Sequence, residues 1–138
     1  MKLISEILNE LRNLPTKQEK IQHLRKNKSA PLIFLMKCAF TTKFNKVKYI
    51  PKYEVDDSPA GYSYTSLRKT WKNIPYFFEK KEGAALEKQK KKLLIMLESL
   101  HWTESALVEN ILTKNLEALP IDLQTMKEAF PKEFSNYV

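Results

Sequence analysis

The chain has 138 residues and only two glycines, Gly61 and Gly83. Glycine adopts the left-handed backbone conformation more easily than any other residue, and tight turns between adjacent strands depend on that conformation. So few glycines disfavour a fold with many strands. Hydrophobic residues make up 43% of the chain and charged residues 29%, a balance typical of globular proteins. We therefore expect an all-α fold in which residues 1–138 form a single compact domain.

Apolar side chains recur at intervals of three and four residues along most of the chain, which is typical of amphipathic helices. Within one of these segments Pro75 is expected to kink or restart the helix, and Gly83 is expected to end it. The pattern predicts about six or seven helices, near residues 3–14, 16–26, 29–40, 65–82, 85–100, 103–116 and 122–130.

Residues that commonly cap helices stand at the start of several segments. Thr16 and Glu19 have the spacing of a capping box, in which each side chain bonds to the backbone amide of the other residue. Ser29, Thr103 and Asp122 are expected to accept a hydrogen bond from the first turn of the helices that follow them.

The segment from residue 41 to residue 63 interrupts the helical pattern. It includes Asp56-Asp57-Ser58-Pro59-Ala60-Gly61, which is dense in turn-forming residues. A connection of about twenty residues is uncommon in a compact domain, and such connections are often functional or held down by their own aromatic residues. We expect one long irregular connection here.

The residue patterns that support metal binding or catalysis are missing. Two histidines and one cysteine do not make a structural zinc site, which uses four nitrogen or sulfur ligands. Gly61 and Gly83 are too far apart to form a phosphate-binding loop. His101, beside Trp102 at a helix junction, is expected to be structural. We therefore expect no metal, no cofactor and no enzymatic activity, so that the protein acts by binding.

The sequence also bears on the compartment in which the protein works. Its longest purely apolar runs contain five residues, whereas a membrane-spanning helix needs about 20. Glu6 interrupts the region where a signal peptide would be continuously apolar. The single cysteine, Cys38, lies on an apolar helix face and fits a core position in a reducing compartment. These features predict a cytoplasmic protein without membrane association.

The net charge of +8 is distributed unevenly along the chain. Residues 17–52 contain ten Lys or Arg and one acid, and residues 68–92 contain nine Lys or Arg and three acids. From residue 93 onward, seven acids outnumber three basic residues. This asymmetry favours a basic face that attracts a polyanion. The alternative is a solvated, lysine-rich surface without a ligand.

The kinds of basic and aromatic residue suggest how a nucleic acid could be held. With 21 lysines and three arginines, phosphate contact is favoured over base recognition, for which the arginine fork is the usual tool. Tyr49 and Tyr53 alternate with lysines in the long connection and could stack on bases, or could instead anchor that connection on the helices. The candidate nucleic-acid-binding residues are Lys17, Lys20, Arg25, Lys26, Lys28, Lys43, Lys46, Lys48, Tyr49, Tyr53, Arg68, Lys69, Lys72, Lys88, Lys90, Lys91 and Lys92.

Several short stretches resemble a known family. Ile7-Leu8-Asn9-Glu10, Thr16-Lys17-Gln18 and Lys26-Asn27-Lys28 resemble the start of the ATP-dependent DNA ligases of tailed phages. The stretch Met126-Lys127-Glu128-Ala129-Phe130-Pro131 is similar to the last helical hairpin of their N-terminal domain. The resemblance implies an all-helical DNA-binding module that lies on the duplex by backbone contacts. The stretch Met1-Lys2-Leu3-Ile4-Ser5-Glu6, with residues 56–61, also resembles small uncharacterised proteins of large tailed phages, which implies a phage protein in the host cytoplasm.

The chain departs from the ligases in two places. It has no Asp-Gly pair, so the Lys-x-Asp-Gly motif that carries the ligase nucleophile is absent and ligation is excluded. The hairpin turn, glycine-containing in ligases, reads Ala118-Leu119-Pro120 between Glu117 and Asp122. Because proline lacks an amide and acids repel phosphate, any DNA contact is expected on residues 17–52 and 68–92 instead.

Two functions are therefore open. The first is sequence-independent binding of nucleic acid, duplex or single-stranded, through phosphate contacts. The alternative is a protein-binding module that engages or inhibits a host or phage protein in defence, transcription or a structural role.

Overall fold

Eight α-helices and three short 3-10 helices follow one another along residues 2–137, the part of the chain that the computed structural model describes. These residues contain no strand, and the predicted all-α fold is confirmed. The α-helices are α1 (Ile4–Glu10), α2 (Lys17–Lys26), α3 (Ala30–Phe40), α4 (Leu67–Thr70), α5 (Gly83–Ser99), α6 (Trp102–Leu112), α7 (Leu123–Ala129) and α8 (Pro131–Phe134). The 3-10 helices are η1 (Leu11–Asn13), η2 (Trp71–Phe78) and η3 (Leu116–Ala118).

Most of the predicted caps are present. The Thr16 hydroxyl accepts from the Glu19 amide at 3.1 Å, and Asp122 Oδ1 accepts from the Thr125 amide at 2.8 Å. The second bond of the predicted capping box, from the Thr16 amide to the Glu19 side chain, is not formed among the described residues. Ser29 caps α3 in the same way. The prediction for Thr103 is wrong, because α6 already begins at Trp102 and the ring of His101 accepts from the Thr103 amide at 3.2 Å. His101 is a structural residue, as expected.

The region around Pro75 differs from the prediction. The helix that begins at Leu67 becomes a 3-10 helix at Trp71 and ends at Phe78, because Pro75 has no amide to continue an α-helical ladder. The prediction that Gly83 ends this helix is therefore wrong. Gly83 is instead the first residue of α5, and its φ of +59° is one that glycine adopts without strain.

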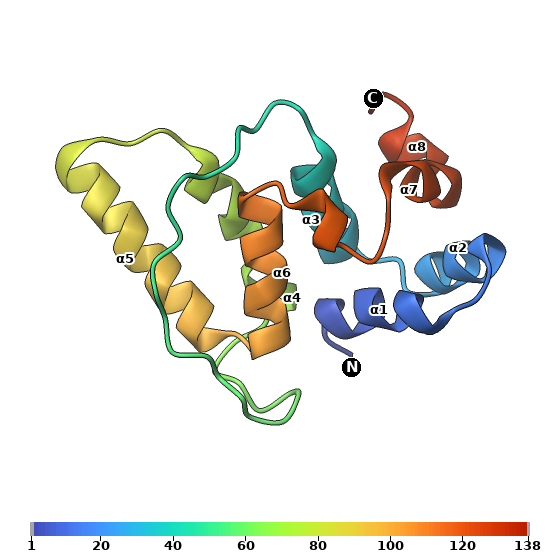
Figure 1. The fold of residues 1–138 in the computed structure, drawn as a ribbon, viewed down its shortest axis with the longest axis horizontal. Coiled ribbons are helices and arrows are strands. Elements are labelled where there is room, and N and C mark those ends of the chain that lie inside the picture. Colours follow the sequence, from blue (N-terminus) through green and yellow to red (C-terminus); the bar gives the residue numbers. More distant parts are fainter. Residues whose placement is uncertain (1, 138) are drawn as a thin grey trace.

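Helices α3 and α6 lie at the centre of the molecule, with α5 on one side and the cluster of α1, α2, α7 and α8 on the other (Figure 1). Leu32, Leu35 and Met36 of α3 are fully buried, as are Ile111 and Leu112 of α6. The core is continuous from α1 to α8. This arrangement places α5 on the side of the molecule away from the helices of the two chain ends, whereas α4 lies near the start of α1 (Figure 1).

The predicted irregular connection is confirmed and runs from Thr41 to Ser66 between α3 and α4. It passes beside α6 and crosses α5 as an extended segment (Figure 1). The amide of Val47 donates to Leu112 O at 2.7 Å, and the amide of Glu54 donates to the Glu98 carboxylate at 2.9 Å. Backbone bonds therefore attach the connection to both helices along its length.

Candidate nucleic-acid interface

Several basic side chains of α2, and Lys28 just after it, are exposed but contact the C-terminal helices. Lys17 forms an ion pair with Glu128, and Lys28 pairs with Glu133 at 2.9 Å. Arg25 donates to the backbone carbonyls of Glu128 and Ala129, at 3.0 Å each. These contacts join α2 to α7 and α8, so the charges of Lys17 and Lys28 are largely compensated and Arg25 is structural.

Lys20 and Lys26, also on α2, have no carboxylate within ion-pair distance in the described part of the chain. Lys20 is half-buried and lies near Asp122. The pKa of Asp122 is lowered mainly by hydrogen bonds from Thr125, and Lys17 and Lys20 lower it further. Lys26 is exposed, and of the basic residues of this helix it is the one most accessible to a ligand.

Two tyrosines of the connection, Tyr49 and Tyr53, contact residues of the helices beneath them. The Lys90 ammonium of α5 lies over the Tyr49 ring, 4.6 Å from its centroid. Tyr53 is half-buried, and burial together with the neighbouring Glu109 carboxylate raises its pKa to about 12. Phe44 stacks on Phe78 with ring centroids 4.5 Å apart. These contacts support the interpretation that the rings anchor the connection.

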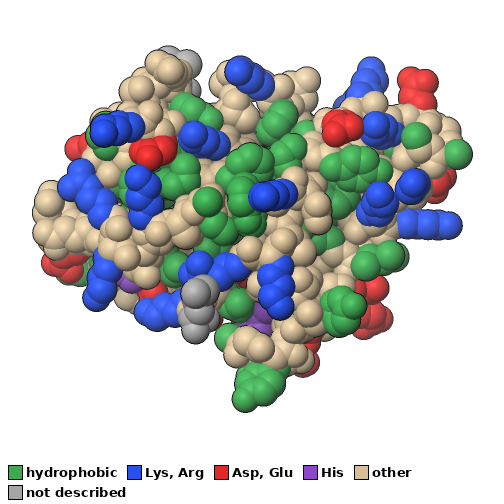
Figure 2. All heavy atoms as spheres, turned by 180° about the vertical axis from the view of Figure 1, so that it is seen from behind, with side chains coloured by type: hydrophobic (Ala, Val, Ile, Leu, Met, Phe, Trp, Pro, Cys, Tyr) green, Lys and Arg blue, Asp and Glu red, His purple; other side chains and the backbone are tan. Residues whose placement is uncertain are grey.

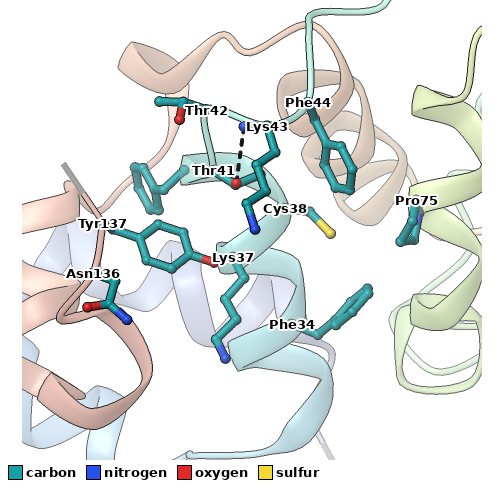
Figure 3. Close-up of a pocket in the computed structure, with 11 residues that line it drawn as sticks. Phe34, Lys37, Cys38, Thr41, Thr42, Lys43, Phe44, Pro75, Asn136 and Tyr137 are labelled. Carbon is teal, nitrogen blue, oxygen red and sulfur yellow. Dashed lines mark hydrogen bonds between the residues drawn. The ribbon is translucent and has the colours of Figure 1, made fainter.

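The lysines of the connection remain accessible. Lys46 and Lys48 are exposed, and neither is within ion-pair distance of a carboxylate among residues 2–137. The side chain of Lys43 reaches into a cavity of about 510 Å³ between Tyr137 and Cys38 (Figure 3). Burial raises the pKa of the Cys38 thiol to about 11, so it stays protonated at neutral pH and serves as the core residue that was expected.

Five of the predicted residues lie on α4, η2 and α5, and we call them the α4–α5 basic face. All five members are exposed, and none has a carboxylate within ion-pair distance among the described residues. Because α5 buries Gln89, Leu93 and Leu97, its lysines at positions 88, 91 and 92 share the exposed side of the helix. Lys92 also reaches η2, where its ammonium lies 5.2 Å from the centroid of the Tyr76 ring. The α4–α5 basic face consists of Lys69, Lys72, Lys88, Lys91 and Lys92.

Two predicted residues near this face have structural partners. Arg68 donates through Nε to Lys2 O at 2.8 Å, which ties α4 to the N-terminal segment. Lys90 is half-buried, lies 3.8 Å from Glu87 and covers Tyr49. Both side chains are therefore less available to a ligand than the neighbouring lysines of the α4–α5 basic face.

A groove of about 410 Å³ separates α4 and η2 from α5. Phe77 and Met96 lie along it, and Lys92 is its one charged lining residue. At its edge stand Tyr64, which is 90% exposed, and Ile95, which is 64% exposed. The groove therefore combines a cation with exposed apolar surface.

The face opposite to that of Figure 1 displays this combination on a larger scale. Lys and Arg side chains are spread across it, exposed hydrophobic side chains lie between them, and most Asp and Glu side chains lie toward its edges (Figure 2). The predicted residues thus do not form one continuous site. Lys17, Arg25 and Lys28 contact the C-terminal helices, whereas Lys46 and Lys48 lie in the connection. The α4–α5 basic face lies on α4, η2 and α5.

Sequence reasoning missed the most exposed aromatic residues, Tyr62 and Tyr64, which are 79% and 90% exposed. They follow the turn at residues 59–62, where Gly61 has a φ of +92°. Their position next to that run of turn-forming residues was the sequence feature that could have predicted their exposure. Which tyrosines of the connection pack on helices depends on contacts that the local sequence does not specify.

No group of three or more His, Cys, Asp or Glu side chains is placed to hold a metal ion in residues 2–137. Within the same range, no helix combines the length and the apolar character needed to cross a bilayer.

The fold and the exposed lysines define a basic, all-α protein built around α3 and α6. Comparison with protein families identifies its family: the chain belongs to the family of unknown function DUF6433, whose model matches residues 7–118. No curated protein and no solved structure matches the chain.

Proposed function

We propose that this protein binds nucleic acid through sequence-independent phosphate contacts, and that the α4–α5 basic face carries most of them. The observation that supports this is the group of five exposed lysines without carboxylate partners among residues 2–137. Binding would be driven by the release of cations condensed on the phosphates. Because a lysine ammonium is a point charge, such contacts attract phosphate without reading base edges.

The proposal includes a binding role without catalysis and without a cofactor. It also includes a phage-encoded protein that acts in the host cytoplasm, which the likeness to phage ligase DNA-binding domains and to small phage proteins supports. Leu119 and Ile121, in the segment matching the ligase hairpin turn, are buried in the core. Their burial favours DNA contact on the basic face instead of at this turn.

A protein-binding module is the second candidate, and a specific surface favours it. Trp102 is half exposed and lies at a small groove between α1, α6 and η3, with Asn9 and Asn110 beside it. Aromatic residues of this kind are enriched in protein interfaces. A partner captured from infected-cell lysate that persists after nuclease treatment, and is lost in Trp102→Ala, would support this function.

The proposal predicts that lysines of the basic face matter more than lysines with ion-pair partners. A variant carrying Lys69→Gln, Lys72→Gln, Lys88→Gln and Lys91→Gln should bind labelled duplex DNA at least tenfold more weakly at about 100 mM salt. Its log–log salt slope should be shallower by about 3 to 4, because each phosphate contact contributes about 0.9. Fluorescence anisotropy measures both quantities.

The matched control removes the same charge at lysines that have carboxylate partners: Lys2→Gln, Lys17→Gln, Lys28→Gln and Lys81→Gln. We expect its affinity to fall by less than about threefold, since exposed ion pairs contribute little to stability and these charges are already compensated. Equal losses in the two variants would show that net charge alone governs binding and that the basic face has no special role.

A further inference from the structure

We infer that the groove between α4, η2 and α5 holds an unpaired base of a single-stranded nucleic acid, stacked on Tyr64. This inference rests on the proposed function and narrows it, because it makes single strands the preferred ligand over duplexes of equal phosphate number. In a duplex the faces of internal bases are covered by their neighbours, so they cannot reach a protein ring.

Tyr64 holds an exposed ring beside the groove. Its ring is 90% exposed, although a large aromatic side chain usually gains stability from burial. Its backbone is nevertheless held, because the amide of Thr65 donates to Ser99 O at 3.1 Å at the end of α5. The ring therefore projects from a fixed point beside the groove instead of from a free loop.

The loop before Tyr64 is ordered by its own hydrogen bonds. The amide of Ser58 donates to Asp56 Oδ1 at 3.0 Å, and the amide of Tyr62 donates to Pro59 O at 3.1 Å. The backbone of Asp56 is joined to α6, because the Trp102 amide donates to Asp56 O at 3.0 Å. These contacts orient the segment toward the end of α5 and spare a ligand part of the entropy of ordering it.

The lining of the groove suits a nucleic-acid base. Phe77, Met96 and Ile95 supply apolar surface against which a base face can pack. Thr70 and Asn73 supply polar groups for base edges. No Asp or Glu lines the groove. Stacking on an aromatic ring beside cations is the general mode by which single strands are held without sequence preference.

Charge selects the occupant. Lys92 lines the groove, and Lys69 and Lys72 adjoin its lining residues Thr70 and Asn73 in sequence. On α5, Lys88 and Lys91 precede Lys92 by one helical turn and one residue. Lys72 and Lys92 already lie over the Trp71 and Tyr76 rings, but none of these cations has an anionic partner among the described residues. A purely apolar peptide would supply none, whereas a nucleotide strand places a phosphate next to every base.

The test compares Tyr64→Ala with Tyr62→Ala, a matched variant of another highly exposed tyrosine that does not line the groove. Ligands are an oligothymidine of about 12 nucleotides and a duplex with the same number of phosphates, at about 100 mM salt. We expect Tyr64→Ala to weaken binding of the single strand about tenfold and binding of the duplex less than about twofold. Tyr62→Ala and the ring-preserving Tyr64→Phe should keep wild-type affinity for both ligands.

The outcomes separate this inference from the proposed function. If wild-type protein binds both ligands and Tyr64→Ala changes neither affinity, or both equally, the groove does not hold a base while nucleic-acid binding stands. If wild-type protein binds neither ligand even at about 50 mM salt, the proposed function fails and the inference fails with it. A protein partner that survives nuclease treatment and is lost in Tyr64→Ala would assign the groove to a protein and overturn the inference.

Discussion

Replacing Glu104 by alanine is expected to lower the free energy of unfolding by about 3 kcal/mol or more. The Glu104 side chain is fully buried in α6, and its Oε1 accepts a hydrogen bond from the Leu67 amide at 3.0 Å. That amide begins α4 inside the core, so no water can replace the lost acceptor. The substitution also leaves a cavity. Chemical denaturation followed by circular dichroism measures the loss.

The control is Glu104→Gln, which keeps a side-chain oxygen for the Leu67 amide and removes the charge. We expect its unfolding free energy to equal or exceed that of the wild type at neutral pH, within about 1 kcal/mol. A loss as large as that of the alanine variant would show that the carboxylate charge itself is required. In that case hydrogen bonding to α4 would not be the main contribution of Glu104.

The pH dependence of this pair has a definite sign. Burial raises the pKa of Glu104 above its ordinary value of 4.5, although amides of Leu67, Ile4 and Ser5 partly oppose the shift. A raised pKa in the folded state means that protonation favours folding. The contribution is full below pH 4.5 and is lost as the pH rises through the raised folded-state pKa. The stability of the wild type relative to Glu104→Gln should therefore decline as the pH rises above 4.5.

Replacing Lys114 by methionine is expected to lower the free energy of unfolding by about 2 to 3 kcal/mol. Lys114 Nζ donates to the carbonyl oxygens of Cys38, Ala39 and Thr41, at 2.6, 3.0 and 3.0 Å. These carbonyls lie at the C-terminal end of α3, where helical partners are lacking and a cation is favoured by the helix dipole. Methionine keeps the length of the side chain and removes all three donors.

The aromatic neighbours of Lys114 strengthen this expectation. Its ammonium lies 5.2 Å from the centroid of the Phe78 ring and 5.9 Å from that of Phe44. Burial lowers the pKa of Lys114, because removal from water disfavours the charged ammonium. The contacts of the ammonium with carbonyl oxygens and aromatic rings must offset this desolvation. Thermal unfolding of Lys114→Met should be compared with that of Lys132→Met, which changes an exposed lysine of α8. Equal melting temperatures would show that the contacts of Lys114 contribute no stability.

These two residues show why part of the structure could not be predicted from sequence. Helix positions and the caps at Thr16, Ser29 and Asp122 depend on neighbours three or four residues away, so local spacing was sufficient. Glu104 and Lys114 act on backbone groups of distant segments, 37 and 76 residues away in sequence. Nothing in their local context distinguishes them from solvated charges.

The candidate site could also be predicted only in part from the sequence. Composition indicated a basic protein, and the cluster at residues 88–92 was visible in the sequence. The pairing of Lys17 with Glu128 and of Lys28 with Glu133 could not be seen in the sequence, because more than a hundred residues separate the partners. The predicted stacking residues were Tyr49 and Tyr53, which pack against helices, whereas Tyr64 stands free beside the groove.

The salt dependence of duplex binding tests the central claim most directly. Fluorescence anisotropy of a labelled duplex should give a log–log slope near −5 between about 50 and 200 mM salt, as about six phosphate contacts require. Affinity should then fall by about a thousandfold over that range. Absence of binding at about 50 mM salt, or an affinity that does not change with salt, would contradict binding through the lysines of the α4–α5 basic face.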